Sequence, residues 1–290
     1  MRSIVINWQS LRTQPIDWQL SPAWIAASVV VVFAGYAALI EAWRRVVLSM
    51  GERLPFSAAV RIWFLASLGK YVPGKVWAVA GAAVLARRAG VDPSAAVAGA
   101  LVLQALALAS GAVAVAFTAG DTFQALGPDV VPIAGAVLLA CAGGIGVLAS
   151  QTLLDRISRL LPRSLPPLRA IRPAMLALGF AANLFAWIAY GAALLFLTRG
   201  VLPDVNLSLP QAVGVFTCSY LVGFIALFAP GGLGPRESVF LLMLAGEIGL
   251  KPAAGLALAS RLLLTGTEVL PAVPLLLRRG SASPPSAREA

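Results

Sequence analysis

The sequence predicts an all-α, polytopic membrane protein with two inverted repeats, each containing an interrupted or re-entrant helix pair. Of its 290 residues, 59% are hydrophobic and only 12% are charged, whereas ordinary soluble domains carry about 25% charged residues. Apolar runs long enough to cross a bilayer recur along the chain, and two further apolar stretches are interrupted by Pro and Gly. Because so little polar surface remains to coat a water-soluble protein, composition alone assigns the chain to the membrane class.

Charge and residue usage exclude several other classes. The net charge is +10, but arginine and lysine collect in the cytoplasmic loops of membrane proteins, so we expect no nucleic-acid partner. Histidine is absent, which removes Ser–His and Cys–His nucleophile pairs and most zinc sites. The two cysteines, Cys141 and Cys218, lie in separate apolar runs and form no metal or disulfide pattern. Without an acidic cluster or a phosphate-binding loop, we expect no metal, no cofactor and no enzyme activity.

Five apolar runs are long enough to span a membrane, which takes about 20 residues. Four carry no internal charge: 21–40, 94–120, 130–154 and 173–198. The fifth, 252–277, carries Arg261 and Glu268. The first run is followed by Trp43-Arg44-Arg45 rather than by a small-residue cleavage site, so we expect it to remain as a helix.

Two other apolar stretches, 57–88 and 211–247, contain breaks. The first break reads Lys70-Tyr71-Val72-Pro73-Gly74-Lys75, and the second reads Pro230-Gly231-Gly232-Leu233-Gly234-Pro235-Arg236-Glu237. Proline and glycine end one helix and begin another. The arms of the first stretch have about 13 residues, or roughly 20 Å of helix, so neither spans comfortably. We interpret both stretches as re-entrant or broken helix pairs, although the uncharged first arm of the second is also long enough to span.

Loop charges orient these segments. The connection 151–172 holds five arginines and is expected inside, whereas the connection 121–129 has two aspartates with no basic residue and is expected outside. Helix 130–154 joins the two. The first interrupted stretch then begins and ends inside, and the second begins and ends outside. The same scheme places the N-terminus outside, against the charges of Arg2 and Arg12.

The two halves resemble each other in layout. Repeats at about 21–120 and 173–277, linked by helix 130–154, form a transmembrane domain over 21–277. A polar N-terminal segment (1–20) and a disordered tail (278–290) flank this domain. Pro73-Gly74 corresponds to Pro230-Gly231, and the Gly90 to Pro93 link corresponds to Gly249 to Pro252. Inverted repeats with broken helices are typical of secondary transporters, which bind substrate where half-helices meet.

The breaks also carry the candidate chemistry. A helix that begins inside a membrane offers bare backbone N–H groups and a dipole that favours an anion. Lys70 and Lys75 flank the first break, and Arg236 lies in the first turn after Pro235, so a phosphate or carboxylate head group would suit both breaks. The alternative is that the lysines snorkel to the interface and that Arg236 pairs with Glu237.

Two charges lie deep in the last apolar run. Arg261 and Glu268 are seven residues apart, which places them on one helical face, and such charges usually face the bundle interior. Arg261 either completes an anion site with Arg236 or neutralises Glu237.

The two breaks, together with Gly249-Leu250-x-Pro252 and Arg261, resemble the signatures of the flippase-like lysylphosphatidylglycerol synthase transmembrane family. The second break is the more specific signature, and the resemblance covers about 24–277. It implies a bacterial inner-membrane protein that translocates or handles lipids, as members that flip aminoacylated phospholipids do. Members usually begin with an additional spanning helix, whereas residues 1–20 of this sequence are polar. The aminoacyl-transferase domain of the full synthases is also absent, so we do not expect this chain to make the aminoacylated lipid. Carried over, the family pattern favours Lys70, Pro73, Gly74, Pro230, Gly231, Gly232, Gly234, Arg236, Glu237 and Arg261.

We therefore predict a multi-pass inner-membrane lipid transporter whose partners are lipids with anionic or zwitterionic head groups. One alternative is a membrane enzyme acting on polyprenyl-phosphate-linked lipids or phospholipids, in which Glu41, Glu237 and Glu268 are the available bases. The other is an accessory subunit for a separately encoded transferase. The predicted substrate-binding residues are Lys70, Tyr71, Pro73, Gly74, Lys75, Pro230, Gly231, Gly232, Gly234, Arg236, Glu237, Arg261 and Glu268.

Overall fold

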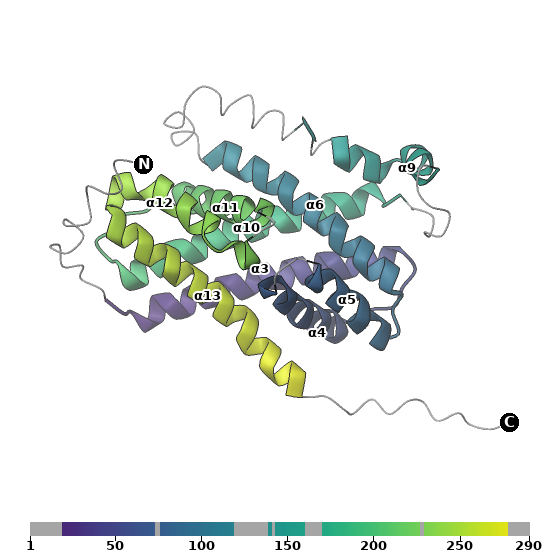
Figure 1. The fold of residues 1–290 in the computed structure, drawn as a ribbon, viewed down its shortest axis with the longest axis horizontal. Coiled ribbons are helices and arrows are strands. Elements are labelled where there is room, and N and C mark those ends of the chain that lie inside the picture. Colours follow the sequence, from purple (N-terminus) through teal and green to yellow (C-terminus); the bar gives the residue numbers. More distant parts are fainter. Residues whose placement is uncertain are drawn as a thin grey trace.

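The computed structural model describes residues 19–72, 76–118, 139–140, 143–159, 170–226 and 229–277, and every regular element within them is a helix (Figure 1). Among these described residues, four helices are long and apolar enough to cross a membrane, namely α3, α6, α10 and α13, which confirms the predicted class. In chain order the elements are α3 (Pro22–Ser49), α4 (Phe56–Ser67), η1 (Leu68–Tyr71), α5 (Trp77–Arg88), α6 (Pro93–Thr118), α9 (Gln151–Ser158), α10 (Pro173–Val201), α11 (Leu209–Ile225), η2 (Pro230–Gly232), α12 (Pro235–Ile248) and α13 (Leu250–Leu277).

Helix α3 is longer than the apolar run that predicted it. The run 21–40 stops at the first charge, but the helix continues to Ser49. Glu41 binds Arg44 and Arg45 one turn further on, each at 2.7 Å, and pairs at this spacing stabilise a helix. Hydropathy therefore marked the membrane-facing part of α3 and missed its charged end.

Part of the predicted helix 130–154 lies outside the described residues. Residues 143–149 are helical, but Ser150 is not, and α9 begins at Gln151. The predicted helix therefore ends earlier than expected. The predicted segments 1–20 and 278–290 fall almost entirely outside the described residues, and the division into domains stays a prediction.

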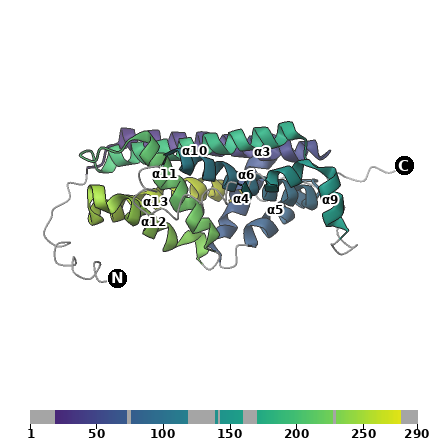
Figure 2. The same cartoon turned by 90° about the horizontal axis from the view of Figure 1, so that it is seen from above.

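Helices α3 and α10 form a long antiparallel pair. The backbone N–H of Ser21 donates to the Gly200 carbonyl at 2.9 Å, so the start of α3 lies beside the end of α10. Gly35 permits the close contact midway, because a Cβ there would lie 3.2 Å from the Tyr190 ring. Figure 2 shows this pair as one layer of the molecule.

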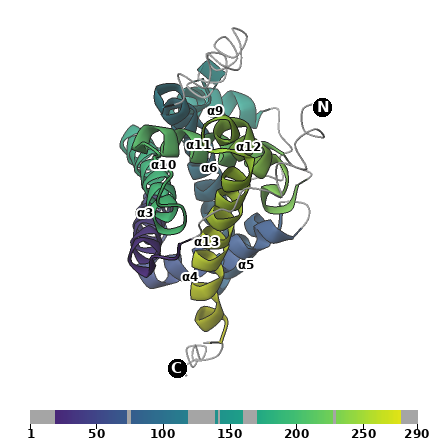
Figure 3. The same ribbon diagram turned by 90° about the vertical axis from the view of Figure 1, so that its left-hand side faces the viewer.

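The remaining long helices lie against that layer. Helix α10 also packs against α6 and α11, while α13 packs against α12 and α4 (Figures 2 and 3). Helix α5 packs between α4 and α6, and α11 packs against α6. Each half of the chain thus supplies helices that contact the other half.

The chain is interrupted at both predicted breaks. The first has α4 and α5 of 12 residues each around η1, or about 18 Å per arm. The second has α11 of 17 residues and α12 of 14 around η2, or about 26 and 21 Å. All four arms are shorter than the roughly 30 Å hydrocarbon core of a bilayer. The two turns, η1 and η2, contact each other.

Apolar side chains are also exposed on the outer faces of the long helices, which is the surface expected of a protein surrounded by lipid. Helix α13 additionally holds Pro271 and Pro274 in its second half. Examples of exposed apolar residues on α3, α6, α10 and α13 are Val30, Leu101, Phe117, Phe185, Ile188, Leu262, Leu270 and Leu277.

Candidate functional site

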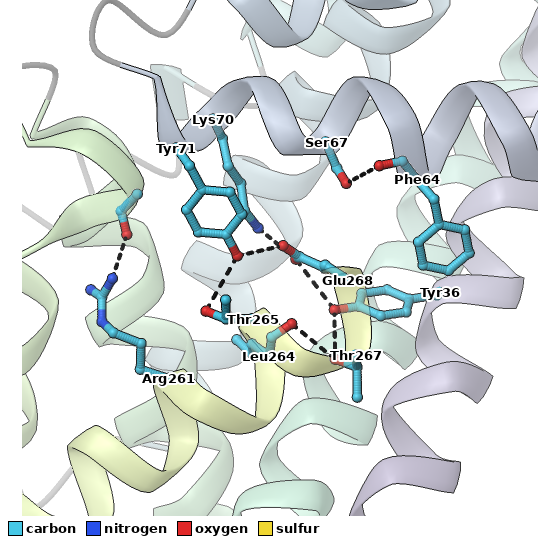
Figure 4. Close-up of polar contacts among 11 residues, drawn as sticks. Tyr36, Phe64, Ser67, Lys70, Tyr71, Arg261, Leu264, Thr265, Thr267 and Glu268 are labelled. Atoms are coloured by element: carbon cyan, nitrogen blue, oxygen red, sulfur yellow. Dashed lines mark hydrogen bonds and ion pairs between the residues drawn. The ribbon is translucent and has the colours of Figure 1, made fainter. Parts of the chain in front are cut away.

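Charged side chains from both breaks converge on the middle of α13, and Figure 4 shows Lys70 and Tyr71 of the first break beside Glu268 of that helix. Because α13 is 28 residues long, its central residues are far from either end. The residues come from η1, the first turn of α12, and α13. Helix α12 packs against α13, and η1 reaches α13 through the side chains of Lys70 and Tyr71. We name this set the break cluster: Lys70, Tyr71, Arg236, Glu237, Arg261 and Glu268.

Both carboxylate oxygens of Glu268 accept hydrogen bonds. The Lys70 ammonium donates to one carboxylate oxygen at 2.5 Å, and the Tyr71 hydroxyl donates to the other at 2.8 Å. The Tyr36 hydroxyl, from the middle of α3, donates to the first oxygen at 3.3 Å. Only 7% of Glu268 is exposed, and a buried carboxylate of this kind requires such partners.

Tyr71 joins the two breaks directly. Its ring lies over Gly231 of η2, where a Cβ would be 3.4 Å from the ring. Gly231 has φ of +58°, in the left-handed region that glycine adopts without strain. The Arg261 guanidinium donates to the Gly231 carbonyl at 3.4 Å, and the Tyr71 and Thr265 hydroxyl oxygens lie 3.3 Å apart, within hydrogen-bond distance. A glycine is therefore needed both for the turn and for the contact.

Glu237 is held by Arg261 rather than by its neighbour in sequence. The Arg261 Nε donates to one Glu237 oxygen at 2.5 Å, and the backbone N–H of Gly234 donates to the other at 2.8 Å. The structure thus shows that Arg261 neutralises Glu237. The alternative pairing of Arg236 with Glu237 is not formed.

Arg236 is buried without a carboxylate among the described residues. Its Nη2 donates to the Ser260 hydroxyl at 3.0 Å, and its guanidinium carbon lies 5.2 Å from the centre of the Phe216 ring. The rings of Tyr220 and Phe240 are each 6.0 Å away. Only 7% of Arg236 is exposed, and its Nε has no hydrogen-bond acceptor in the part of the chain that the structure describes. Aromatic faces attract a cation, but they do not replace an anion.

The cluster consequently carries an excess of positive charge. Its three cations, Lys70, Arg236 and Arg261, face two carboxylates, which leaves one net positive charge. Arg261 also has a buried Nη2 without an acceptor among the described residues, and Arg236 binds Ser260, the residue that precedes Arg261 on α13. An uncompensated buried charge is costly, so this place is chemically suited to bind an oxyanion.

The remaining predicted residues either shape the backbone of the second break or lie outside the described residues. Pro230 begins η2, and Gly234 precedes α12 with φ of +89°. Gly232 has φ of +72°, and a Cβ there would lie 3.0 Å from the Gly223 Cα. Pro73, Gly74 and Lys75 fall outside the described residues.

Several contacting residues were not predicted. Six of them carry a hydroxyl or phenol inside an apolar run, which does not reveal the direction in which the side chain points, and the other two are phenylalanines with no such signal. Tyr36 and Tyr190 pack edge to face at 6.0 Å, and Tyr190 leads on to Phe216 at 5.3 Å. The unpredicted residues around the cluster are Tyr36, Tyr190, Phe216, Tyr220, Phe240, Ser260, Thr265 and Thr267.

Metal binding finds no support in the part of the chain that the structure describes. Within those ranges, no three His, Cys, Asp or Glu side chains lie close enough together to hold an ion. The two carboxylates of the break cluster bind Lys70 and Arg261 instead.

Comparison with known families identifies the chain. The model described as the lysylphosphatidylglycerol synthase TM region matches residues 6–271, a range that includes every residue of the break cluster. No curated protein is significantly similar to the chain. Since the match covers most of the sequence, the chain belongs to this family of membrane proteins.

Proposed function

We propose that this member of the lysylphosphatidylglycerol synthase TM region family moves a polar-headed lipid across the membrane. The observation that carries this proposal is Arg236, a buried guanidinium without a carboxylate, placed where two helix breaks meet in an apolar bundle. A lipid head group would pass the break cluster while its acyl chains stay in the bilayer. Charges held inside a membrane protein commonly mark the path of a polar substrate.

The second part of the proposal is that the two halves are inverted repeats. In each half a long helix is followed by an interrupted pair and then by another long helix: α3, α4, α5 and α6, then α10, α11, α12 and α13. The matching first helices, α3 and α10, are antiparallel. In this correspondence α4 matches α11, and α13 matches α6. The contact between α4 and α13 therefore has a counterpart in the contact between α11 and α6, and both contacts occur. These correspondences support a two-fold arrangement of the kind that transporters use.

We further propose that the breaks are re-entrant and lie within the bilayer. Their arms are too short to span, and Lys70 and Glu237 bind residues in the central part of α13, which is long and apolar enough to span. Polar backbone at membrane depth is tolerated where protein buries it, and contact between η1 and η2 provides that burial. The membrane in question is the bacterial inner membrane, with lipids as partners.

The ion pairs favour a protein that moves the lipid without changing it chemically. The three carboxylates available as general bases all hold cations: Glu41 holds Arg44 and Arg45, Glu237 holds Arg261, and Glu268 holds Lys70. A carboxylate that is engaged in this way is a poor proton acceptor. We therefore propose that the protein is not itself an enzyme.

The test is reconstitution of the purified protein in liposomes that contain a fluorescent phosphatidylglycerol. If the protein moves lipid, a membrane-impermeant quencher added outside will bleach more than the outer-leaflet half of the label. The Arg236→Gln variant should lose most of this activity. The matched control is Arg199→Gln, since Arg199 is exposed at the far end of α10 and lies over the Trp24 ring.

Two other outcomes separate the alternatives. A change in head-group composition would reveal an enzyme. If the protein showed no transport and no chemistry, the result would indicate an accessory subunit for a transferase. Full transport by Arg236→Gln, with the variant monodisperse in detergent, would show that the break cluster is not the path.

A further inference from the structure

We propose that the break cluster selects lipids whose head group carries one net negative charge. This inference rests on the proposed function and adds the chemical class of the substrate. Its basis is the charge of the buried groups, in which Lys70 and Arg261 are each matched by a carboxylate and Arg236 is not.

The unused hydrogen-bond donors indicate the shape of the missing group. Arg236 Nε and Arg261 Nη2 are both buried without an acceptor among the described residues. The two side chains lie side by side, because Arg236 binds Ser260, the residue that precedes Arg261 on α13. A phosphodiester has two equivalent free oxygens and one negative charge, so it could accept from both arginines and cancel the excess charge. Charge-assisted bonds of this kind are roughly twice as strong as neutral ones.

A zwitterionic head group fits less well. Its phosphate could accept from Arg236, but its ammonium would need a carboxylate of its own. Glu237 already accepts from Arg261 and from the Gly234 backbone, and Glu268 already accepts from Lys70 and Tyr71. The ammonium would therefore remain buried without a partner, which is costly in a membrane.

A head group with two negative charges also fits less well. It would turn an excess of one positive charge into an excess of one negative charge, again without a partner among the described residues of the cluster. The prediction is thus a preference for a phosphodiester with an uncharged substituent over both the zwitterion and the phosphomonoester.

The experiment measures binding before transport. Short-chain phosphatidylglycerol, phosphatidylethanolamine and phosphatidic acid are titrated into the purified protein in detergent, and thermal stabilisation is recorded for each. We expect phosphatidylglycerol to half-saturate at a concentration at least tenfold below that of phosphatidylethanolamine and below that of phosphatidic acid. The Arg236→Gln variant has two cations and two carboxylates in the cluster. In this variant the half-saturating concentrations of phosphatidylglycerol and phosphatidylethanolamine should differ by less than threefold.

Two further variants make the result specific. Arg236→Lys keeps the charge but loses the planar set of donors, so it should weaken binding of all three lipids while keeping the order of preference. Arg199→Gln should keep both the affinity and the order. A preference that survives in Arg236→Gln, or the absence of any preference in the unaltered protein, would overturn the inference.

The liposome assay then distinguishes this inference from the proposed function. Labelled versions of the three lipids are compared in vesicles of otherwise identical composition. Transport of all three at equal rates would refute the selectivity and leave transport standing. Transport of none would refute the proposed function, even if the binding preference were observed.

Discussion

At the scale of single residues, Glu268 and Arg236 are opposites. Glu268 has a cation and two phenols around its carboxylate, whereas Arg236 has a hydroxyl, three aromatic rings and one N–H without an acceptor. The first arrangement holds η1 against α13 and α3. The second leaves binding capacity unused. Stability and substrate binding are thus expected to depend on different members of the same cluster.

Replacement of Glu268 by glutamine should destabilise the protein by about 2 kcal/mol. Loss of one partner of a buried ion pair costs about 3–5 kcal/mol, but the Lys70 side chain is 31% exposed, so water reduces the cost. Reversible denaturation in detergent micelles measures it. The matched control is Glu41→Gln, at an ion pair near the end of α3, which should cost less than about 1 kcal/mol. Equal losses for the two variants would contradict a stabilising role for the Glu268 contacts.

The sequence predicted which residues belong to the site better than it predicted their partners. Lys70, Arg236 and Glu268 were identified because charge is rare in apolar runs. Which cation meets which carboxylate depends on the rotation of each helix about its axis and on contacts between distant segments. Spacing along one helix does not determine these. The pairing of Lys70 with Glu268 therefore came from the structure alone, and the pairing of Arg261 with Glu237 was one of two alternatives that the sequence left open.

At the scale of elements, the second break is packed so closely that glycine is required. A Cβ on Gly232 would lie 3.0 Å from the Gly223 Cα, so η2 touches the backbone of α11. The same contact holds the first turn of α12, with Arg236, against α11, because a Cβ on Gly223 would lie 3.2 Å from the Arg236 Cβ. Small residues thus position the guanidinium.

Substitution of Gly232 by alanine should therefore cost more than the same change at Gly90. The two glycines have nearly equal φ angles, +72° and +74°, but a Cβ on Gly90 would have no atom within 4 Å. The left-handed conformation costs about 1–2 kcal/mol in either variant, and overpacking adds about 1–3 kcal/mol at Gly232 alone. Denaturation in micelles compares them. The close approach of η2 to α11 would be refuted by equal losses.

Helix breaks were predictable because proline and glycine act locally. Both interruptions occur at the Pro- and Gly-rich segments, and α11 proved to be 17 residues long rather than a full span. Helix ends were less predictable. The end of α3 at Ser49 and the non-helical Ser150 depend on side-chain pairs and on neighbouring segments, which a hydropathy pattern does not report.

At the scale of the whole molecule, the direction of α10 sets the arrangement. Its first residues follow Arg172 and its last turn contains Arg199, both of which are exposed. Helix α3 runs the opposite way, so Gly51, after its end, lies on the side of Arg172. Loop charges predicted that side to be cytoplasmic, and antiparallel packing of the two helices is consistent with it.

Single cysteines should report this topology. In a variant with Cys141 and Cys218 replaced by serine, a cysteine at Arg172 or Gly51 should react with an impermeant maleimide only in inside-out vesicles. A cysteine at Asp204, in the exposed connection after α10, should react only from the opposite side. Labelling of Arg172→Cys and Asp204→Cys from the same side would remove the proposed inverted arrangement.

The long pairing of α3 with α10 also has a consequence for biosynthesis. Helix α3 ends at Ser49, but α10 does not begin until Pro173, and ribosomes add about 5–20 residues per second. Helix α3 must therefore wait in the bilayer for roughly 6 to 25 seconds before α10, its main neighbour, begins to emerge from the translocon. During this interval the phenol of Tyr36 lacks its later hydrogen-bond acceptors on α13. The contacts of the break cluster with α3 therefore form among the last events of biosynthesis.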